Sequence, residues 1–173
     1  TSAEIAKGSE GADAILVTPV DKINADLIAR LPSSVRMIAT FSVGYEQIDL
    51  SAARARGLPV SNKPDVLTDA TADICMALLL GVARRVVEGD RYVREGKFPG
   101  AQSAQLEGGA VTGKTLGLVG GGGRIGRAVA RRAAGFGMKL LYSTPRRKPE
   151  AEEQEAGISY RTLDELLAES DFV

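Results

Sequence analysis

The pattern of apolar and polar positions is clearest between residues 115 and 142 of this chain. Thr115–Val119 is a continuous apolar run of residues that favour strands. After a run of glycines, the apolar positions from Ile125 to Ala133 recur at i, i+3 and i+4 spacing, with arginines on the other faces. Residues 139–142, which end in Leu140, Leu141 and Tyr142, then supply the next strand. This order predicts a strand, a glycine turn, an amphipathic helix and a second strand, which together form a βαβ unit.

The same alternation of strand and helix patterns extends over most of the chain. The predicted strands are residues 14–18, 36–40, 58–61, 115–119 and 139–142, and the predicted helices are residues 24–30, 51–56, 68–94, 125–133 and 163–170. Such alternation predicts an α/β fold with parallel strands and right-handed crossovers. The long helix, capped by Thr68 or Asp69, is apolar nearly all round as far as Leu80, so we expect it to be buried between two domains or two subunits. We place the domain boundary near residue 66.

The glycine turn carries candidate chemistry. Gly121, Gly123 and Gly126 satisfy the G-x-G-x-x-G pattern of dinucleotide-binding sites, which needs a tight turn, close approach to a pyrophosphate and close packing of helix on strand. The N–H groups that open the helix, near Arg124 and Ile125, would face the phosphates. A flexible glycine loop is the alternative. Because four glycines run from 120 to 123, the extra residue can also shift the register of the motif.

The end of the second strand of this unit indicates which nucleotide binds. An NAD site usually has an acid there, but this chain has Thr144, Pro145, Arg146, Arg147 and Lys148. Hydroxyls followed by cations suit a 2′-phosphate, so the sequence favours NADP(H), with NAD possible. The alternative is that the basic run is an ordinary solvated loop.

Composition narrows the remaining classes. The 173 residues are 44% apolar and 25% charged with no net charge, which is typical of a globular protein and suggests neither nucleic acid nor a membrane as a partner. The longest apolar stretch, residues 74–83, is about half of what a bilayer span needs. It contains the only cysteine, Cys75, for which a buried thiol in a reducing cytoplasm is expected. The sequence has no histidine, and no metal site is predicted.

Both ends suggest a piece of a longer protein. Residues 171–173 have the pattern of a strand that is just starting. The first clear element, residues 14–18, is a strand with no visible partner before it.

Four ordered segments carry a family resemblance. They read VGYEQIDL at residues 43–50, RGLPVSN at 56–62, DVLTDATAD at 65–73 and GKTLGLV at 113–119, the last leading into the glycine motif. Together they resemble the D-isomer-specific 2-hydroxyacid dehydrogenases. Residues 66–73 and 142–150 are most similar to the glyoxylate and hydroxypyruvate reductase branch.

The resemblance implies a two-domain enzyme, usually a homodimer, that moves a hydride from NAD(P)H to a 2-oxo acid. Residues 1–66 would be part of a flavodoxin-like substrate domain, and residues 67–173 part of a doubly wound, Rossmann-like cofactor domain, both incomplete. The backbone of Val43 and Gly44 would meet the substrate carboxylate, and Thr71 would lie by the cofactor. From spacing alone, residues 42–44 are more typical of an ordinary turn at a strand exit than of a substrate site.

The resemblance also implies what this chain lacks. The catalytic Arg, Glu and His of the family lie in a later part of the protein, so no catalytic residue is assigned here. Lys63 stands where the family commonly has Thr. It lies near the expected substrate cleft, although a solvated loop lysine is the simpler interpretation.

Two other functions stay open at this point: a phosphoglycerate-type dehydrogenase, and a non-catalytic dinucleotide sensor similar to a corepressor. A histidine with an acidic partner beyond residue 173 would favour an enzyme over a sensor. The sequence does not indicate which 2-oxo acid is used.

Overall fold

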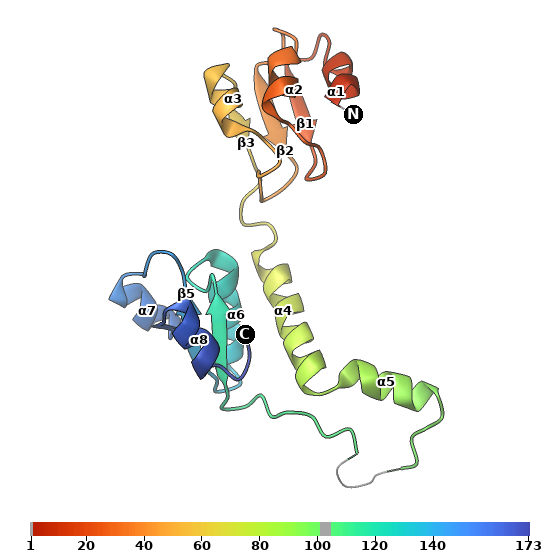
Figure 1. Ribbon diagram of the computed structural model, residues 1–173, viewed down its shortest axis with the longest axis vertical. Coiled ribbons are helices and arrows are strands. Elements are labelled where there is room, and N and C mark those ends of the chain that lie inside the picture. Colours follow the sequence, from red (N-terminus) through yellow and green to blue (C-terminus); the bar gives the residue numbers. More distant parts are fainter. Residues whose placement is uncertain (1, 101–104) are drawn as a thin grey trace. The chain divides into compact units, whose positions relative to one another are not determined.

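The computed structural model describes residues 2–100 and 105–173. Its contacts divide the chain into two compact units, one ending at Leu67 and the other beginning at Thr68. This division falls one residue after the expected boundary at 66. Each unit is an α/β structure built on a parallel sheet, as the sequence pattern predicts (Figure 1).

The first unit has a three-stranded parallel sheet in the order β1-β2-β3. Its elements are α1 Ser2–Gly8, β1 Ala14–Val17, α2 Ala25–Arg30, β2 Met37–Thr40, α3 Leu50–Ala55 and β3 Val60–Ser61. Asn24 caps α2 by accepting a hydrogen bond from the N–H of Leu27, and Asp49 caps α3 in the same way at Ala52. Ile23, between β1 and α2, is fully buried in the core of this unit.

Two details of the first unit go beyond the sequence-based expectation. Helix α1, which the pattern did not predict, precedes the first strand. Strand β1 pairs with β2, which follows it, with Ile15 in register with Ile38. Residues 14–18, for which the sequence shows no partner before them, thus pair with the strand that follows.

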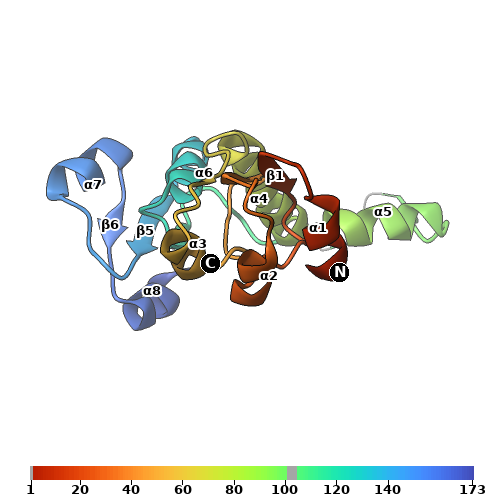
Figure 2. The same ribbon diagram turned by 90° about the horizontal axis from the view of Figure 1, so that it is seen from above.

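The second unit also has a three-stranded parallel sheet, in the order β4-β5-β6. Its elements are α4 Thr68–Ala83, α5 Val86–Arg94, β4 Thr115–Val119, α6 Arg124–Ala134, β5 Lys139–Ser143, α7 Glu150–Ala156, β6 Ser159–Tyr160 and α8 Leu163–Glu169. Helices α6 and α8 lie on opposite faces of the sheet (Figure 2). On the other edge of β4, Leu116 forms a parallel bridge with Phe172, where the sequence predicted a starting strand.

The long helix expected from residue 68 to about 94 is broken into α4 and α5. Arg85 adopts a left-handed conformation with φ of 53°, which cannot continue a right-handed helix. Its guanidinium group turns to Glu88, with the closest N–O distance 2.6 Å, and to the carbonyl of Glu107 at 3.3 Å. Gly108 also passes against the backbone of Ala83, at the end of α4. The loop therefore crosses the helix end, and α5 leaves at an angle to α4 (Figure 1).

One face of α4 packs on α6 through Ala72 and Met76. Arg132 on α6 forms an ion pair with Asp73 on α4, with an N–O distance of 2.6 Å. Two other side chains of α4, Leu78 and Val82, are 62% and 78% exposed in this single chain, and the expected burial between two domains or two subunits stays a prediction. Among the described residues, no helix is both long enough and apolar enough to cross a membrane.

Candidate cofactor and substrate sites

The glycine turn joins β4 to α6 and accommodates one extra residue. Gly120 has a φ of +82°, a backbone conformation that favours glycine. Its N–H donates to the carbonyl of Ser143 on β5 at 2.8 Å, and its carbonyl accepts from the N–H of Gly123 at 2.9 Å. The turn is thus closed by its own backbone and tied to the neighbouring strand. Gly120 takes the left-handed position before the three motif glycines.

The three motif glycines have different surroundings. A Cβ added at Gly121 would lie 2.6 Å from the Cβ of Leu118 and 2.7 Å from that of Tyr142, so this position must stay small. A Cβ at Gly126 would collide with the backbone of Gly121, which shows close packing of helix on strand. At Gly123 the added atom would meet only the carbonyl oxygen of Gly120, at 3.2 Å. A pyrophosphate is predicted to lie in this space beside Gly123, which we call the cradle.

Helix α6 begins directly at this turn. Gly123 is its N-cap, in an extended conformation, and no side chain caps the helix. Arg124 and Ile125 follow as its first residues, so their amides lie at the positive end of the helix dipole. An anion is favoured at this place.

The basic loop after β5 separates its three cations. The Thr144 hydroxyl donates to the carbonyl of Arg146 at 2.7 Å and so closes a tight turn. The Arg146 side chain is exposed and makes no hydrogen bond or ion pair with any residue that the structure describes. The carbon stem of Lys148 lies near Gly122, where an added Cβ would meet Lys148 Cε at 3.0 Å. Arg146 is therefore available to a ligand, and Lys148 reaches toward the glycine turn.

Arg147 is directed to a buried carboxylate instead. Its Nε and Nη2 atoms each lie 2.8 Å from one oxygen of Glu153 on α7, a side chain that is only 8% exposed. The hydrogen bonds from Arg147 lower the pKa of Glu153 to about 2, and Glu153 in turn raises the pKa of Arg147. Both groups are charged at neutral pH. The two arginines that the sequence treated alike thus have different partners.

Thr71 lies in the first turn of α4 and is half-buried. The helix that carries it packs against α6, whose first residues follow the glycine turn. Its predicted contact with the cofactor stays a prediction.

The predicted substrate turn follows β2 in the first unit. Its three carbonyl groups are occupied: that of Ser42 accepts from the N–H of Lys63 at 2.9 Å, that of Val43 from Asn62 Nδ2 at 2.8 Å, and that of Gly44 from the Ser42 hydroxyl at 2.6 Å. Within the described part of the chain, the amides of Val43 and Gly44 donate to no carbonyl or side chain. A turn with bound carbonyls and free N–H groups suits an anion, although the Glu46 carboxylate lies against Gly44.

Lys63 lies beside this turn but points to an aromatic ring. Its Nζ is 5.5 Å from the ring centroid of Phe41, at the distance of a cation–π contact. The residue is exposed, as expected for a loop lysine.

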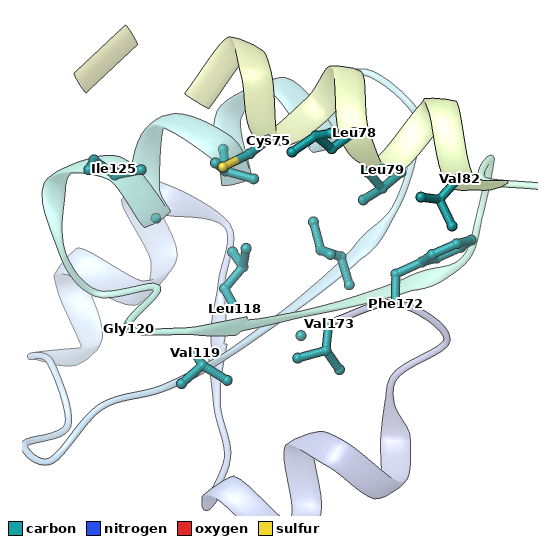
Figure 3. Close-up of a pocket in the computed structure, with 14 residues that line it drawn as sticks. Cys75, Leu78, Leu79, Val82, Leu118, Val119, Gly120, Ile125, Phe172 and Val173 are labelled. Atoms are coloured by element: carbon teal, nitrogen blue, oxygen red, sulfur yellow. The ribbon is translucent and has the colours of Figure 1, made fainter. Parts of the chain in front are cut away.

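An apolar cleft of about 610 Å³ lies beside β4 in the second unit (Figure 3). Leu78 and Val82 of α4, Ile125 of α6 and Phe172 are among the residues that line it. It reaches Gly120 but includes no residue of the basic loop. Two residues of the predicted phosphate site, Ile125 and Gly126, line this cleft, whereas Gly121 and Gly123 do not.

Residues 76–173 match a family model described as the D-isomer specific 2-hydroxyacid dehydrogenase, NAD binding domain. The chain belongs to this family. The predicted resemblance is confirmed, and the second unit contains the family's domain for a nicotinamide dinucleotide. Among the described residues, no group of potential ligands could hold a metal ion.

Named relatives agree with this assignment. The chain is 48% identical over 165 residues to the glyoxylate reductase of Thermococcus litoralis, covering 93% of this chain and 49% of that protein. It is 39% identical over 170 residues to the glycerate dehydrogenase of Hyphomicrobium methylovorum, covering 98% of this chain and 52% of that protein. A crystal structure of a glyoxylate reductase from Paecilomyes thermophila has a TM-score of 0.83 at 35% identity, covering 98% of this chain and 52% of that one. The chain spans about half the length of these relatives.

Sequence reasoning missed Glu153 and the role of Tyr142. Both are buried, and the Tyr142 hydroxyl donates to Glu153 at 2.8 Å. Glu153 lies in a nearly all-polar segment, EAEEQEA, where nothing marks one acid as the buried one. The one signal in the sequence for an ion pair here was the cationic loop, which is followed closely by several acids.

Proposed function

We propose that the complete protein uses NADP(H) to reduce a small 2-oxo acid, of the glyoxylate or hydroxypyruvate type, to the 2-hydroxy acid. The observation that carries this proposal is the position of the glycine turn, at the uncapped start of α6, beside a loop with an exposed arginine and no acid at the end of β5. The glyoxylate reductase of Thermococcus litoralis, 48% identical, supports the substrate class.

In this proposal the second unit binds the cofactor through groups of two kinds. The glycine turn, with Gly121, Gly123 and Gly126, and the first residues of α6, Arg124 and Ile125, would hold the pyrophosphate. Thr144 and Arg146 would bind the 2′-phosphate, because a guanidinium group matches a phosphate with two parallel hydrogen bonds. Bound NADPH would supply a hydride to the carbonyl carbon of the 2-oxo acid.

The first unit would bind the other reactant. The free amides of Val43 and Gly44 suit the carboxylate that every 2-oxo acid carries. Reduction also needs a proton donor for the nascent alkoxide and a cation near the substrate. Because this chain has no histidine, we propose that the donor lies outside residues 1–173. A homodimer and a cytoplasmic location remain predictions from the sequence.

The test is the oxidation of NADPH by the complete protein, followed by its absorbance. Glyoxylate and hydroxypyruvate should each support turnover, whereas a simple ketone without a carboxylate should not. A protein that binds NADPH but turns over no 2-oxo acid would refute the proposal and favour a dinucleotide sensor.

A further inference from the structure

A buried polar network lies beneath the basic loop and joins four elements of the second unit. The Tyr142 hydroxyl, at the end of β5, donates to Glu153 on α7 and accepts from the backbone N–H of Lys148, both at 2.8 Å. Arg147 binds the same carboxylate through two nitrogens, each at 2.8 Å. Its guanidinium carbon lies 5.7 Å from the ring centroid of Tyr160 on β6.

This network fixes the loop at two successive residues. Arg147 is held by its side chain and Lys148 by its backbone, and the anchors, Tyr142 and Glu153, are both buried. A buried carboxylate with three hydrogen bonds, two of them from a cation, is a rigid attachment point. Arg146 is the residue just before these two, and its guanidinium group is left facing solvent. The backbone of the pinned loop therefore determines where Arg146 points.

We propose that Glu153 and Tyr142 are positioning residues for recognition of the 2′-phosphate: they pin Arg147 and Lys148 so that the loop presents Arg146 to NADP(H). The inference rests on the proposed function, because it assumes that NADP(H) is bound at this loop. It assigns the Arg147 guanidinium group to the buried Glu153 carboxylate and leaves contact with the phosphate to Arg146.

The physical reason is preorganisation. A guanidinium group that is already directed at the phosphate loses less conformational freedom on binding than one on a loose loop. Releasing the loop should therefore weaken NADPH binding, although it would free a second cation, Arg147. If Arg147 were instead a direct ligand of the phosphate, freeing it from Glu153 should strengthen NADPH binding. The two models predict opposite signs.

The experiment measures the Kd of the complete protein for NADPH and for NADH by fluorescence titration, without turnover. In Glu153→Gln and in Arg147→Met, the preference for NADPH over NADH should fall by about tenfold. The double variant should keep the preference of Glu153→Gln, because both substitutions break the contact between Arg147 and Glu153. A thermal melt of each variant separates this loss from a general loss of folded protein.

Glu169→Gln is the matched control. Glu169 pairs with Arg161 at the same 2.8 Å in the same unit, and neither side chain forms a hydrogen bond or ion pair with the described residues of the basic loop. This variant should keep the preference of the wild type. If Glu153→Gln fails to fold, Tyr142→Phe tests the other arm of the network, and a several-fold loss of preference is expected there.

The possible results are distinct. A preference that is unchanged or raised in Glu153→Gln, or unchanged in Tyr142→Phe if that variant is needed, overturns the inference while the proposed function stands. A lower melting temperature with unchanged preference means a purely structural network and also overturns it. A wild type that prefers NADH refutes the NADP(H) proposal itself, and the inference with it.

Discussion

Replacing Gly126 with alanine tests the geometry of the glycine turn most sharply. The added Cβ would lie 2.9 Å from both the carbonyl carbon and the carbonyl oxygen of Gly121, which are backbone atoms that cannot rotate away. Overpacking of this kind costs up to about 3 kcal/mol. The better helix propensity of alanine returns at most about 1 kcal/mol. The net destabilisation of about 2 kcal/mol should lower Tm by about 4–8 °C in a thermal melt of the complete protein.

Gly81→Ala is the matched control, because Gly81 also lies in a helix, α4, and an added Cβ there would have no neighbour within 4 Å among the described residues. This substitution should leave Tm unchanged or raise it slightly. If Gly126→Ala behaves like Gly81→Ala, helix α6 does not pack on the turn as closely as described, and the assignment of the three motif glycines fails.

Four further predictions concern ligands and pH. Thr144→Asp places a carboxylate against the 2′-phosphate, so the Kd for NADPH should rise roughly a hundredfold, with NADH little affected. Gly123→Val should abolish dinucleotide binding in a titration while Tm stays near that of the wild type, because its Cβ enters the cradle and not the core. Since Arg147 lowers the pKa of Glu153 from 4.5 to about 2, the ionised carboxylate stabilises the fold above about pH 4.5. That contribution is lost as the pH falls toward 2, so urea unfolding curves of wild type and Glu153→Gln should converge on acidification. Asn62→Ala removes the hydrogen-bond donor to the Val43 carbonyl. It should raise KM for the 2-oxo acid several-fold more than it lowers kcat, and equal effects on KM and kcat would contradict this expectation.

Elements with strong local signals could be predicted from the sequence. Strand β4 has the predicted bounds, Thr115–Val119, because a continuous apolar run between a lysine and a glycine turn is typical of a strand in a parallel sheet. Asn24 begins α2 as a cap because its side chain satisfies an amide that the helix leaves unpaired. Helix α7, Glu150–Ala156, was not predicted, because its nearly all-polar sequence has no apolar stripe.

Other features depend on contacts between distant residues. The helix break at Arg85 goes with the crossing of the loop near Gly108, more than twenty positions away, and α4 and α5 read as one helix without it. In the candidate site, the glycine spacing and the basic loop were visible, but the difference between Arg146 and Arg147 was not. It depends on Glu153, which belongs to a different element and is buried only in the folded unit.

A crystal structure of the complete protein with NADPH tests the central claim most directly. The account predicts the pyrophosphate against the start of α6, beside Gly123, and the 2′-phosphate within hydrogen-bond distance of the Arg146 guanidinium group, with Arg147 still paired to Glu153. A dinucleotide bound away from the glycine turn, or a 2′-phosphate held by Arg147 with Arg146 in solvent, would contradict it.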